Sequence, residues 1–433
     1  MGLEDKIREK RATVGVIGLG YVGLPLSVEI ARAGFQVVGF ETDPERIEKI
    51  NAGRSYITDV LSETIENLVA HGTLKATGDM TGLKGIDVKV ICVPTPLNDN
   101  REPELTYVKE AADNVAKSIA PGEMIVLEST TYPGTTEEIL QPRLESTGLK
   151  AGNDFYLAFS PERVDPGNKR FSIKNTPKVV GGITKQCTKT ASLFYRQFVK
   201  QVIPVSSTRV AEMTKLLENI YRAVNIALVN ELTLLCDRMG IDVWEVIDAA
   251  STKPFGFTKF TPGPGIGGHC IPLDPFYLAW KAREYDFNTK FIELAGEINQ
   301  QMPYFVVAKI SEALNSRCKS LKDSRVLVLG VTYKKDVPDI RMSPALKVIR
   351  LLQARGADVS YHDPFVVTIS SDLAEMNSIE ITEEVLSRAD CTVITTDHSS
   401  YDWDWIVANS RLIVDTKNAT RHVKDGSEKI VRL

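Results

Sequence analysis

The sequence has few cysteines, and their spacing does not suggest metal binding or a disulfide framework. The six cysteines are scattered without a C-x-x-C pair, at positions 92, 187, 236, 270, 318 and 391. Neither a disulfide-rich secreted domain nor a zinc site is therefore indicated. Isolated thiols are compatible with a reducing compartment, and we expect a cytoplasmic protein.

Long apolar runs and an excess of basic charge are also missing. No apolar run approaches the roughly 20 residues that span a bilayer, and residues 1–11 are mostly charged, without the apolar segment of a signal peptide. The formal net charge of −4 provides no general positive field. We therefore expect neither a membrane nor a nucleic acid as partner, and an anionic ligand would need local lysines and arginines.

Composition and length are those of an ordinary globular enzyme. The chain has 433 residues, of which 43% are hydrophobic and 25% charged. A chain of this length can build two or three domains, each with its own core.

A glycine-rich turn follows the first apolar run. Residues 14–17 predict a buried strand, and Gly18-x-Gly20-x-x-Gly23 leads into a helical pattern at residues 26–33. Gly18 would form the tight turn, Gly20 would let the backbone approach a pyrophosphate, and Gly23 would allow close packing of helix on strand. This order of elements predicts a dinucleotide site.

An acidic residue follows the second predicted strand. The apolar run at residues 35–40 ends at Glu41, about 20 residues beyond the glycines, and Asp43 is a second acid nearby. A carboxylate at this point can bind both ribose hydroxyls and would repel a 2′-phosphate. We therefore predict NAD, rather than NADP, as the cofactor.

A second motif places a thiol in a loop that contains several glycines. Cys270 follows Gly267-Gly268-His269 and precedes Asp274 by four residues, and Pro262-Gly263-Pro264-Gly265 leads into the loop. A backbone of this kind can pass close to a ligand, so Cys270 is a candidate nucleophile. The alternative from the residue alone is a small buried apolar side chain.

The chain divides into three predicted domains. Apolar runs that predict strands, at residues 88–93, 124–127, 155–159 and 179–182 after the first two, alternate with helical patterns up to about residue 205, which predicts a doubly wound sheet. Helical patterns follow at residues 207–239, continuing toward 249, and at 291–315. We therefore predict an NAD-binding domain at 1–205, a central helical domain at 206–318 and a nucleotide domain at 319–433. The long helix is either a dimer face or a helix buried within one chain.

The sheet pattern returns at residues 325–330, but the turn after it differs from the first. Val331-Thr332-Tyr333-Lys334-Lys335-Asp336 lacks the further glycines of a dinucleotide site. A second NAD is therefore not expected. The lysines suit a phosphate-bearing substrate, or else form a solvated turn.

Taken together, these motifs resemble the UDP-sugar 6-dehydrogenase family over nearly the full length of the chain. The resemblance implies two Rossmann-like doubly wound parallel-sheet domains joined by a long central helix. It rests on the glycine turn and on the following segments: Val93-Pro94-Thr95-Pro96, Glu128-Ser129-Thr130, Ser160-Pro161-Glu162-Arg163, Lys215 with Asn219, Gly267 to Cys270 with Asp274, and Lys334-Lys335-Asp336.

Two segments resemble the branch of the family that acts on UDP-N-acetylglucosamine. They are residues 159–168, which contain Ser160-Pro161-Glu162-Arg163, and residues 253–257, Lys-Pro-Phe-Gly-Phe. The resemblance implies oxidation of the sugar C6 hydroxyl to a uronic acid by NAD. The stereochemistry of the sugar stays open, with UDP-N-acetylmannosamine, the galacto epimer and UDP-glucose as alternatives.

The resemblance also implies roles for individual residues. Cys270 would form a thiohemiacetal and then a thioester, and Lys215 with Asn219, spaced as i and i+4 on a helix, would stabilise the oxyanion. Asp274 would accept a proton or position water, and Glu162 with Thr130 would handle the hydrolytic water. From the residues alone, Glu162 could equally be a surface ion-pair partner and Lys215 a solvated helix residue.

The predicted binding residues form two sets. Those for NAD are Gly18, Gly20, Tyr21, Val22, Gly23, Glu41, Asp43, Arg46, Val93, Pro94, Thr95, Ser129 and Thr130. Those for the UDP-sugar are Glu162, Arg163, Val164, Lys215, Asn219, Arg222, Phe255, Phe257, Gly263, Gly267, Lys335, Arg341 and Lys417. Lys417 stands where the family commonly has arginine. Lysine keeps the positive charge but lacks the planar guanidinium fork that makes bidentate contacts. His269 would either lower the pKa of the neighbouring Cys270 thiol or fill space beside it, and we favour the second interpretation.

Two other classes of function share parts of this pattern. A two-electron hydroxyacid-type dehydrogenase would have the glycine turn, Lys215 and Asn219, but would not need Cys270 or the third domain. A non-catalytic nucleotide-sugar sensor would keep both binding domains and tolerate loss of the thiol. The joint presence of Cys270, Lys215, Asn219 and Asp274 favours the 6-dehydrogenase, and we expect a homodimer formed through the central helix and no metal.

Overall fold

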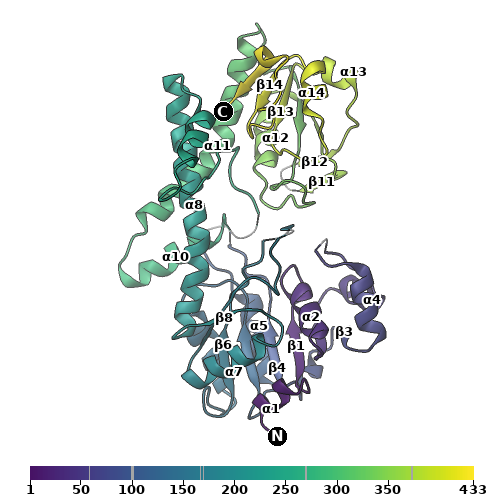
Figure 1. Ribbon diagram of the computed structural model, residues 1–433, viewed down its shortest axis with the longest axis vertical. Helices are drawn as coiled ribbons and strands as arrows, with labels where there is room; N and C mark the ends of the chain where they lie inside the picture. Colours follow the sequence, from purple (N-terminus) through teal and green to yellow (C-terminus); the bar gives the residue numbers. More distant parts are fainter. Residues whose placement is uncertain (58, 99–101, 166, 169, 269–270, 372–373) are drawn as a thin grey trace. The chain divides into compact units, whose positions relative to one another are not determined.

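A computed structural model describes residues 1–57, 59–98, 102–165, 167–168, 170–268, 271–371 and 374–433 (Figure 1). The chain forms two compact units. The first comprises Met1–Glu218 with Trp280–Phe287, and the second comprises Asn219–Ala279 with Asn288–Leu433. The predicted division at residues 205 and 318 remains a prediction. In the part of the chain described, no helix combines the length and apolarity that crossing a bilayer requires.

An eight-stranded sheet forms the centre of the first unit. Its strand order is β3-β2-β1-β4-β5-β6-β7-β8, so the direction of the connections reverses between β1 and β4, as in a doubly wound fold. The strands are β1 Thr13–Ile17, β2 Gln36–Phe40, β3 Leu74–Thr77, β4 Val88–Ile91, β5 Met124–Leu127, β6 Tyr156–Phe159, β7 Lys178–Gly182 and β8 Val202–Pro204.

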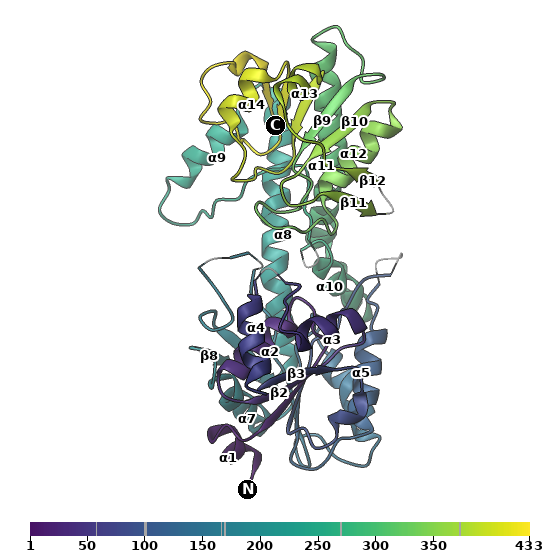
Figure 2. The same cartoon turned by 90° about the vertical axis from the view of Figure 1, so that its right-hand side faces the viewer.

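Helices of the first unit connect these strands. Figure 2 shows α2, α3 and α4 grouped beside β2 and β3. The helices are α1 Leu3–Arg8, α2 Gly23–Arg32, α3 Pro44–Asn51, α4 Ser62–Ala70, α5 Thr106–Ala116, α6 Gln141–Glu145 and α7 Lys185–Tyr195. Short helical turns lie at Met80–Leu83, Thr136–Leu140 and Arg283–Tyr285.

The inner strands of this sheet are buried on both faces. All four residues of β4 and all four of β5 are buried, so β5 is uniformly apolar, and Lys89, the one polar residue of β4, is paired with Glu123. The strands predicted around residues 88–93, 124–127, 155–159 and 179–182 are confirmed. The expected uniformly parallel sheet is corrected in one place, because β6 and β7 pair antiparallel.

Long helices follow the first sheet in the sequence. They are α8 Thr208–Met239, α9 Val243–Ser251, α10 Asp274–Ala282 and α11 Lys290–Asn315. The predicted helices at 207–239 and 291–315 are confirmed. The division between the two units falls within α8 and within α10.

The second unit contains a five-stranded parallel sheet of order β10-β9-β13-β14-β15 and a separate two-stranded antiparallel hairpin, β11 with β12. Apolar side chains of α11 and α12 form a buried cluster with those of β9 and β13. The elements are β9 Arg325–Leu329, α12 Pro344–Ala354, β10 Asp358–His362, β11 Thr368–Ser371, β12 Ala374–Asn377, α13 Glu383–Arg388, β13 Cys391–Ile394, α14 Trp403–Asn409, β14 Ile413–Asp415, a helical turn at Ser427–Lys429 and β15 Ile430–Arg432.

Candidate functional site

The turn after β1 has the geometry expected of a dinucleotide site. Gly18 has a φ of 89°, and a Cβ added there would lie 2.8 Å from the Cys92 carbonyl oxygen. A Cβ at Gly23 would lie 1.8 Å from the Gly18 oxygen, so helix and turn meet too closely for any side chain. A Cβ at Gly20 would have nothing within 4 Å. The turn therefore leaves open space at the one glycine predicted to face the pyrophosphate.

The start of α2 adds a second feature suited to an anion. Its N-cap residue, Val22, makes no side-chain capping bond, and Tyr21 beside it is exposed. Uncapped N–H groups at a helix N-terminus favour a phosphate. Gly20 to Gly23 therefore have the geometry that the predicted pyrophosphate site requires.

Glu41 lies at the end of β2, next to this turn. Its carboxylate accepts hydrogen bonds from the backbone N–H of Leu19 at 3.0 Å and of Thr42 at 2.8 Å. Arg46 lies 3.5 Å from Glu41 and 3.4 Å from Asp43, which caps α3. The structure therefore brings together the acids predicted to select the ribose, and Glu41 is buried.

The residues predicted at the ends of β4 and β5 also lie together. The Ser129 hydroxyl donates to the carbonyl oxygen of Val93 at 2.7 Å. Thr95, two residues after Val93, is buried. The open space at Gly20, the uncapped helix start and Glu41 fit NAD.

Glu162 follows β6 and belongs to a buried ionic network. One carboxylate oxygen accepts from the N–H groups of Arg163 and Val164, each at 2.7 Å, and the other lies 3.1 Å from the Lys178 ammonium. Burial alone would raise the pKa of Glu162, but Lys178 and the two N–H groups lower it below its ordinary value. Sequence reasoning missed Lys178, whose only signal was a lysine at the start of an apolar strand.

Arg163, predicted to contact the sugar, is bound within the first unit. Its guanidinium lies 2.7 Å from Glu218 and donates to the Pro177 carbonyl oxygen at 2.7 Å. An Arg163–substrate contact would therefore require rearrangement of these bonds.

Glu212, a second residue that sequence reasoning missed, anchors the segment after Thr130. It accepts from the N–H groups of Gly134 at 2.6 Å and Thr136 at 2.9 Å. Burial raises the pKa of Glu212 to about 7, against the lowering effect of these hydrogen bonds. Glu212 thus fixes the chain that follows Ser129 and Thr130.

The predicted oxyanion residues lie on α8. Lys215 is 9% exposed, and Asn219 follows one helical turn later on the same face. The Asn219 side-chain amide donates to Asp274, the first residue of α10, which is buried. This bond joins two predicted site residues that lie 55 positions apart in the sequence. Arg222, in contrast, is exposed.

The loop that leads to the candidate nucleophile is held by buried amides. The Gly263 N–H donates to Asn230 at 3.2 Å, and Asn230 donates to Asn299 at 2.9 Å. The Gly268 N–H donates to the Arg341 carbonyl oxygen at 2.9 Å. Cys270 and His269 themselves lie outside the described residues. Phe255 and Phe257, predicted to contact the nucleotide, are exposed.

A cleft of about 210 Å³ in the second unit contains one predicted substrate residue, Lys417. The position of a Cβ at Gly263 lies 3.5 Å from the Lys417 ammonium, so loop and cation approach closely. Lys335 lies 3.7 Å from Asp397, which lines the cleft. The remaining lining residues were not predicted: Trp244, Asp248, Lys259, Thr261, Asn418 and Arg421.

Arg341, also predicted to bind an anion, already holds a carboxylate. Its guanidinium makes a bidentate contact with Asp339, from Nε to Oδ1 at 3.0 Å and from Nη2 to Oδ2 at 2.6 Å. Lys417 and Lys335 are therefore better placed than Arg341 to bind a phosphate.

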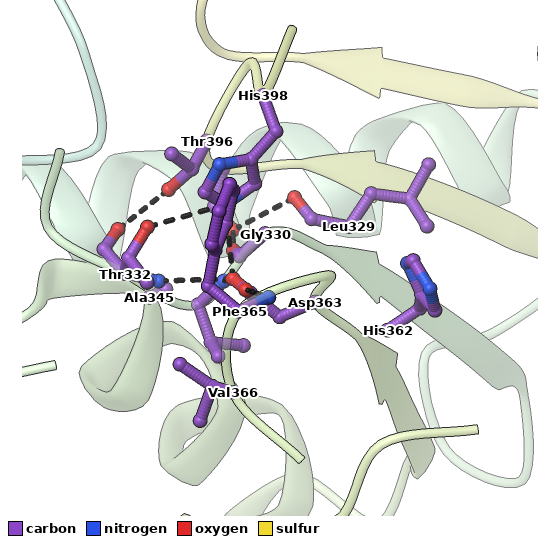
Figure 3. Close-up of polar contacts among 12 residues, drawn as sticks. Leu329, Gly330, Thr332, Ala345, His362, Asp363, Phe365, Val366, Thr396 and His398 are labelled. Atoms are coloured by element: carbon purple, nitrogen blue, oxygen red, sulfur yellow. Dashed lines mark hydrogen bonds and ion pairs between the residues drawn. The ribbon is translucent and has the colours of Figure 1, made fainter. Parts of the chain in front are cut away.

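The turn after β9 is closed by side chains of the second unit (Figure 3). Asp363 accepts from the N–H groups of Val331 at 2.6 Å and Thr332 at 3.3 Å, and from the His398 ring at 3.0 Å. The other His398 nitrogen accepts from the Asp336 N–H at 3.0 Å, so the proton lies on the nitrogen that faces Asp363. The backbone groups of this turn are thus bound within the chain.

Comparison with known families matches three consecutive parts of the chain. The UDP-glucose/GDP-mannose dehydrogenase family matches through its NAD binding domain at residues 12–199, its central domain at residues 209–301 and its UDP binding domain at residues 327–422.

Individual relatives cover most of the chain. UDP-N-acetyl-D-mannosamine dehydrogenase of Pyrococcus horikoshii is 38% identical over 94% of this chain and 95% of its own. UDP-N-acetyl-D-glucosamine 6-dehydrogenase of Pseudomonas aeruginosa is 36% identical over 82% of this chain and 84% of its own. The solved Pyrococcus horikoshii structure has a TM-score of 0.88 at 36% identity, covering 97% of this chain and 98% of that one.

Proposed function

The chain belongs to the UDP-glucose/GDP-mannose dehydrogenase family, an NAD-dependent oxidoreductase family, and from this premise we propose that it oxidises the C6 hydroxyl of a UDP-N-acetylhexosamine to the carboxylate. The observation that carries the proposal is the hydrogen bond between Asn219 and Asp274. It joins the predicted oxyanion donor to the carboxylate that follows Cys270 by four residues.

NAD, when bound, supplies the acceptor for the hydride that leaves the sugar carbon. Gly20 and the start of α2 would hold its pyrophosphate, and Glu41 would accept hydrogen bonds from the adenosine ribose. Val93, Thr95 and Ser129 lie on the adjoining strand ends, where the rest of a dinucleotide is held in this fold.

Cys270 supplies the covalent chemistry of the proposal. Its sulfur adds to the carbon of the aldehyde formed by the first oxidation and gives a thiohemiacetal. The second oxidation removes a hydride and a proton from that adduct and leaves a thioester. Water then bonds to the thioester carbon, the carbon–sulfur bond breaks, and the electron pair returns to the sulfur. The net reaction consumes one alcohol, one water and two NAD.

Lys215 and Asn219 would stabilise the negative oxygen that develops in each step. The ammonium supplies charge, which the burial of Lys215 strengthens, and the amide supplies a directed donor. Asp274 orients the Asn219 amide and would accept a proton or position water. Glu162, with Thr130, would bind the hydrolytic water.

The cleft around Lys417 is the proposed site for the UDP group. Lys417, Lys335 and Arg421 supply cations. Phosphate recognition by lysine relies on charge rather than on a planar fork, which is compatible with Lys417 where the family commonly has arginine.

UDP-N-acetylglucosamine is the substrate we place first, since residues 159–168 and 253–257 resemble that branch and a Pseudomonas aeruginosa relative bears that name. UDP-N-acetylmannosamine is the second candidate, favoured by the name of the Pyrococcus horikoshii relative. Specificity constants for the two epimers, UDP-N-acetylgalactosamine and UDP-glucose decide between them. A preference for UDP-glucose would refute the N-acetylhexosamine assignment.

The reaction class is tested by stoichiometry. We expect two NADH and one carboxylate for each UDP-sugar consumed, without release of free aldehyde. We also expect Cys270→Ser to bind NAD and UDP-sugar but to lose steady-state turnover, because an ester hydrolyses far more slowly than a thioester. One NADH for each substrate would favour the hydroxyacid-type alternative instead.

Residues on one side of α8 support the expected homodimer. Eight exposed apolar residues recur every three, four or seven positions, which corresponds to one face of the helix. They are Val210, Met213, Leu217, Tyr221, Leu228, Leu232, Leu235 and Met239. We expect Leu232→Asp with Leu235→Asp to convert the dimer to a monomer by light scattering, and unchanged mass would locate the dimer contact elsewhere.

A further inference from the structure

A lysine that no sequence motif singled out lies behind Glu162. The Lys178 ammonium is 2.7 Å from Glu128 and 3.1 Å from Glu162, and its side chain is 4% exposed. A buried ammonium requires such partners, because burial without them strongly disfavours the charge. Lys178 is therefore bound to both carboxylates at once.

The antiparallel pairing of β6 and β7 sets this position. Ala158 pairs with Gly182 and Phe159 with Gly181, and the Ser160 hydroxyl donates to the Val179 carbonyl oxygen at 2.8 Å. The same register, continued beyond the end of β6, places residue 162 opposite residue 178. Backbone pairing thus holds the cation next to Glu162.

Tyr195 contacts both Glu128 and Lys178. The Tyr195 hydroxyl donates to Glu128, and the Lys178 ammonium lies 5.4 Å from the Tyr195 ring centroid. Glu128 and Tyr195 are almost completely buried, so neither can move into solvent without disrupting the core. Lys178 therefore lies between Glu128 and Tyr195 on one side and Glu162 on the other.

We propose that Lys178 is a positioning residue for thioester hydrolysis, which holds the Glu162 carboxylate ionised and oriented toward the attacking water. The proposal rests on the role proposed above for Glu162. A carboxylate offers about four acceptor positions, and among the described residues Glu162 uses three, for Arg163, Val164 and Lys178. The fourth can accept from water. That water forms the new bond to the thioester carbon, Cys270 departs as the thiolate, and the released proton passes by way of Glu162 to solvent.

The charged and titratable groups around Glu162 predict the effect of removing the lysine. Lys178 from β7 is its cationic neighbour, Glu128 follows β5, the Cys92 thiol follows β4, and the Arg163 guanidinium is turned to Glu218. Without Lys178, the carboxylate would lie in a buried site beside a second carboxylate. The pKa of Glu162 should then rise, and hydrolysis should lose rate at a higher pH than in the wild type.

Rapid-mixing measurements of NADH formation test the proposal. With Lys178→Met we expect a burst of two NADH for each Cys270, followed by a steady-state rate at least about tenfold below that of the wild type. The acidic limb of the steady-state rate should move upward by about one pH unit. Lys178→Arg should restore most of the rate, since it retains the charge.

A matched control separates this role from a purely structural one. Lys89 is also a fully buried lysine of the same sheet, paired with Glu123. Lys89→Met should lower thermal stability without a new burst or a shifted pH profile. If Lys178→Met does not fold, the double variant Lys178→Met with Glu128→Gln removes one cation and one anion together, and it should show the same burst with a smaller upward shift of the acidic limb.

Two results would overturn the inference. One is a Lys178 variant that behaves like Lys89→Met. The other is a Glu162→Gln variant that hydrolyses the thioester at the wild-type rate, because Lys178 could then not act through Glu162. Failure of the proposed function is distinguishable from both, since it would appear in the wild type as one NADH for each substrate.

Discussion

The two sheets begin with the same turn, and only one of the turns is open to a ligand. Gly18 follows β1 and Gly330 follows β9, with φ angles of 89° and 80°. The Gly18 N–H donates to the carbonyl oxygen of Phe40, and the Gly330 N–H donates to that of His362. In each unit an acidic residue, Glu41 or Asp363, comes directly after the neighbouring strand. The two turns are therefore equivalent in position.

They differ at the third residue of the turn. Gly20 leaves space for a ligand, whereas the equivalent Thr332 is 1% exposed and its hydroxyl donates to the Lys334 carbonyl oxygen. Glu41 binds the N–H of Leu19 alone within the turn, whereas Asp363 binds those of both Val331 and Thr332. In the turn after β9, Thr332 fills the position of Gly20, and Asp363, one methylene shorter than Glu41, binds the backbone N–H groups. The equivalent groups of the turn after β1 are the ones proposed to bind a pyrophosphate.

Gly23→Ala should produce the largest effect. The added Cβ would lie 1.8 Å from backbone oxygen, so α2 must shift. We expect the free energy of unfolding to fall by about 3 kcal/mol and NAD affinity by about 100-fold, or about 2.7 kcal/mol. Chemical unfolding and calorimetric titration with NAD measure the two. Gly330→Ala is the matched control, because a Cβ there lies 2.5 Å from the Thr396 oxygen. It should destabilise the protein with unchanged NAD affinity, and a weakened NAD affinity would contradict the assignment of the turns.

Asp363→Ala should follow, with a loss of about 2 kcal/mol, because it leaves buried N–H groups without their acceptor. Asp363→Asn keeps one acceptor oxygen and should lose less. Hydrogen exchange should locate the loosening at Val331 and Thr332, while NAD affinity stays constant.

The acid response of Asp363 has a defined sign. Burial alone would raise its pKa, but His398 and the N–H groups of Val331 and Phe365 lower it below its ordinary value. The stability that ionised Asp363 contributes is therefore present above about pH 3.9 and is lost as the pH falls through the lower folded value. The stability difference between wild type and Asp363→Asn should shrink in that range, and a constant difference down to pH 2 would contradict this account.

Cofactor choice should change by a smaller amount. The wild type should prefer NAD over NADP by at least about tenfold, or about 1.4 kcal/mol. Glu41→Gln keeps a hydrogen-bond acceptor but removes the charge, so it should lose most of that preference. Ratios of kcat/KM for the two cofactors measure it. Asp363→Asn should leave the ratio unchanged, and equal use of both cofactors by the wild type would show that Glu41 does not face the ribose.

Gly20→Ala should have the smallest effect on unfolding. Nothing lies within 4 Å of the added Cβ, so the free energy of unfolding should change by no more than about 0.5 kcal/mol. The increase in melting temperature on addition of NAD should nevertheless shrink, since the methyl group enters the space meant for the cofactor. An undiminished increase would show that the pyrophosphate binds elsewhere.

The sequence by itself determined the features that depend on neighbouring residues. An apolar run between turn residues predicted β5 at residues 124–127, and the structure has the same bounds. The glycine spacing predicted an open turn after β1, and the absence of further glycines after Gly330 predicted a different one. These features follow from local sterics and from the burial pattern of a short segment. Both can be inferred from residues that are neighbours in the sequence.

Tertiary structure alone decided which distant side chains meet. The antiparallel register of β6 and β7 brings Lys178 to Glu162, and the path between α8 and α10 brings Asn219 to Asp274. Asp363 binds the turn after β9 only because β10 lies beside that strand. Strand register and helix packing depend on the whole core, so the partner of a buried charge cannot be inferred from the residues next to it in the sequence.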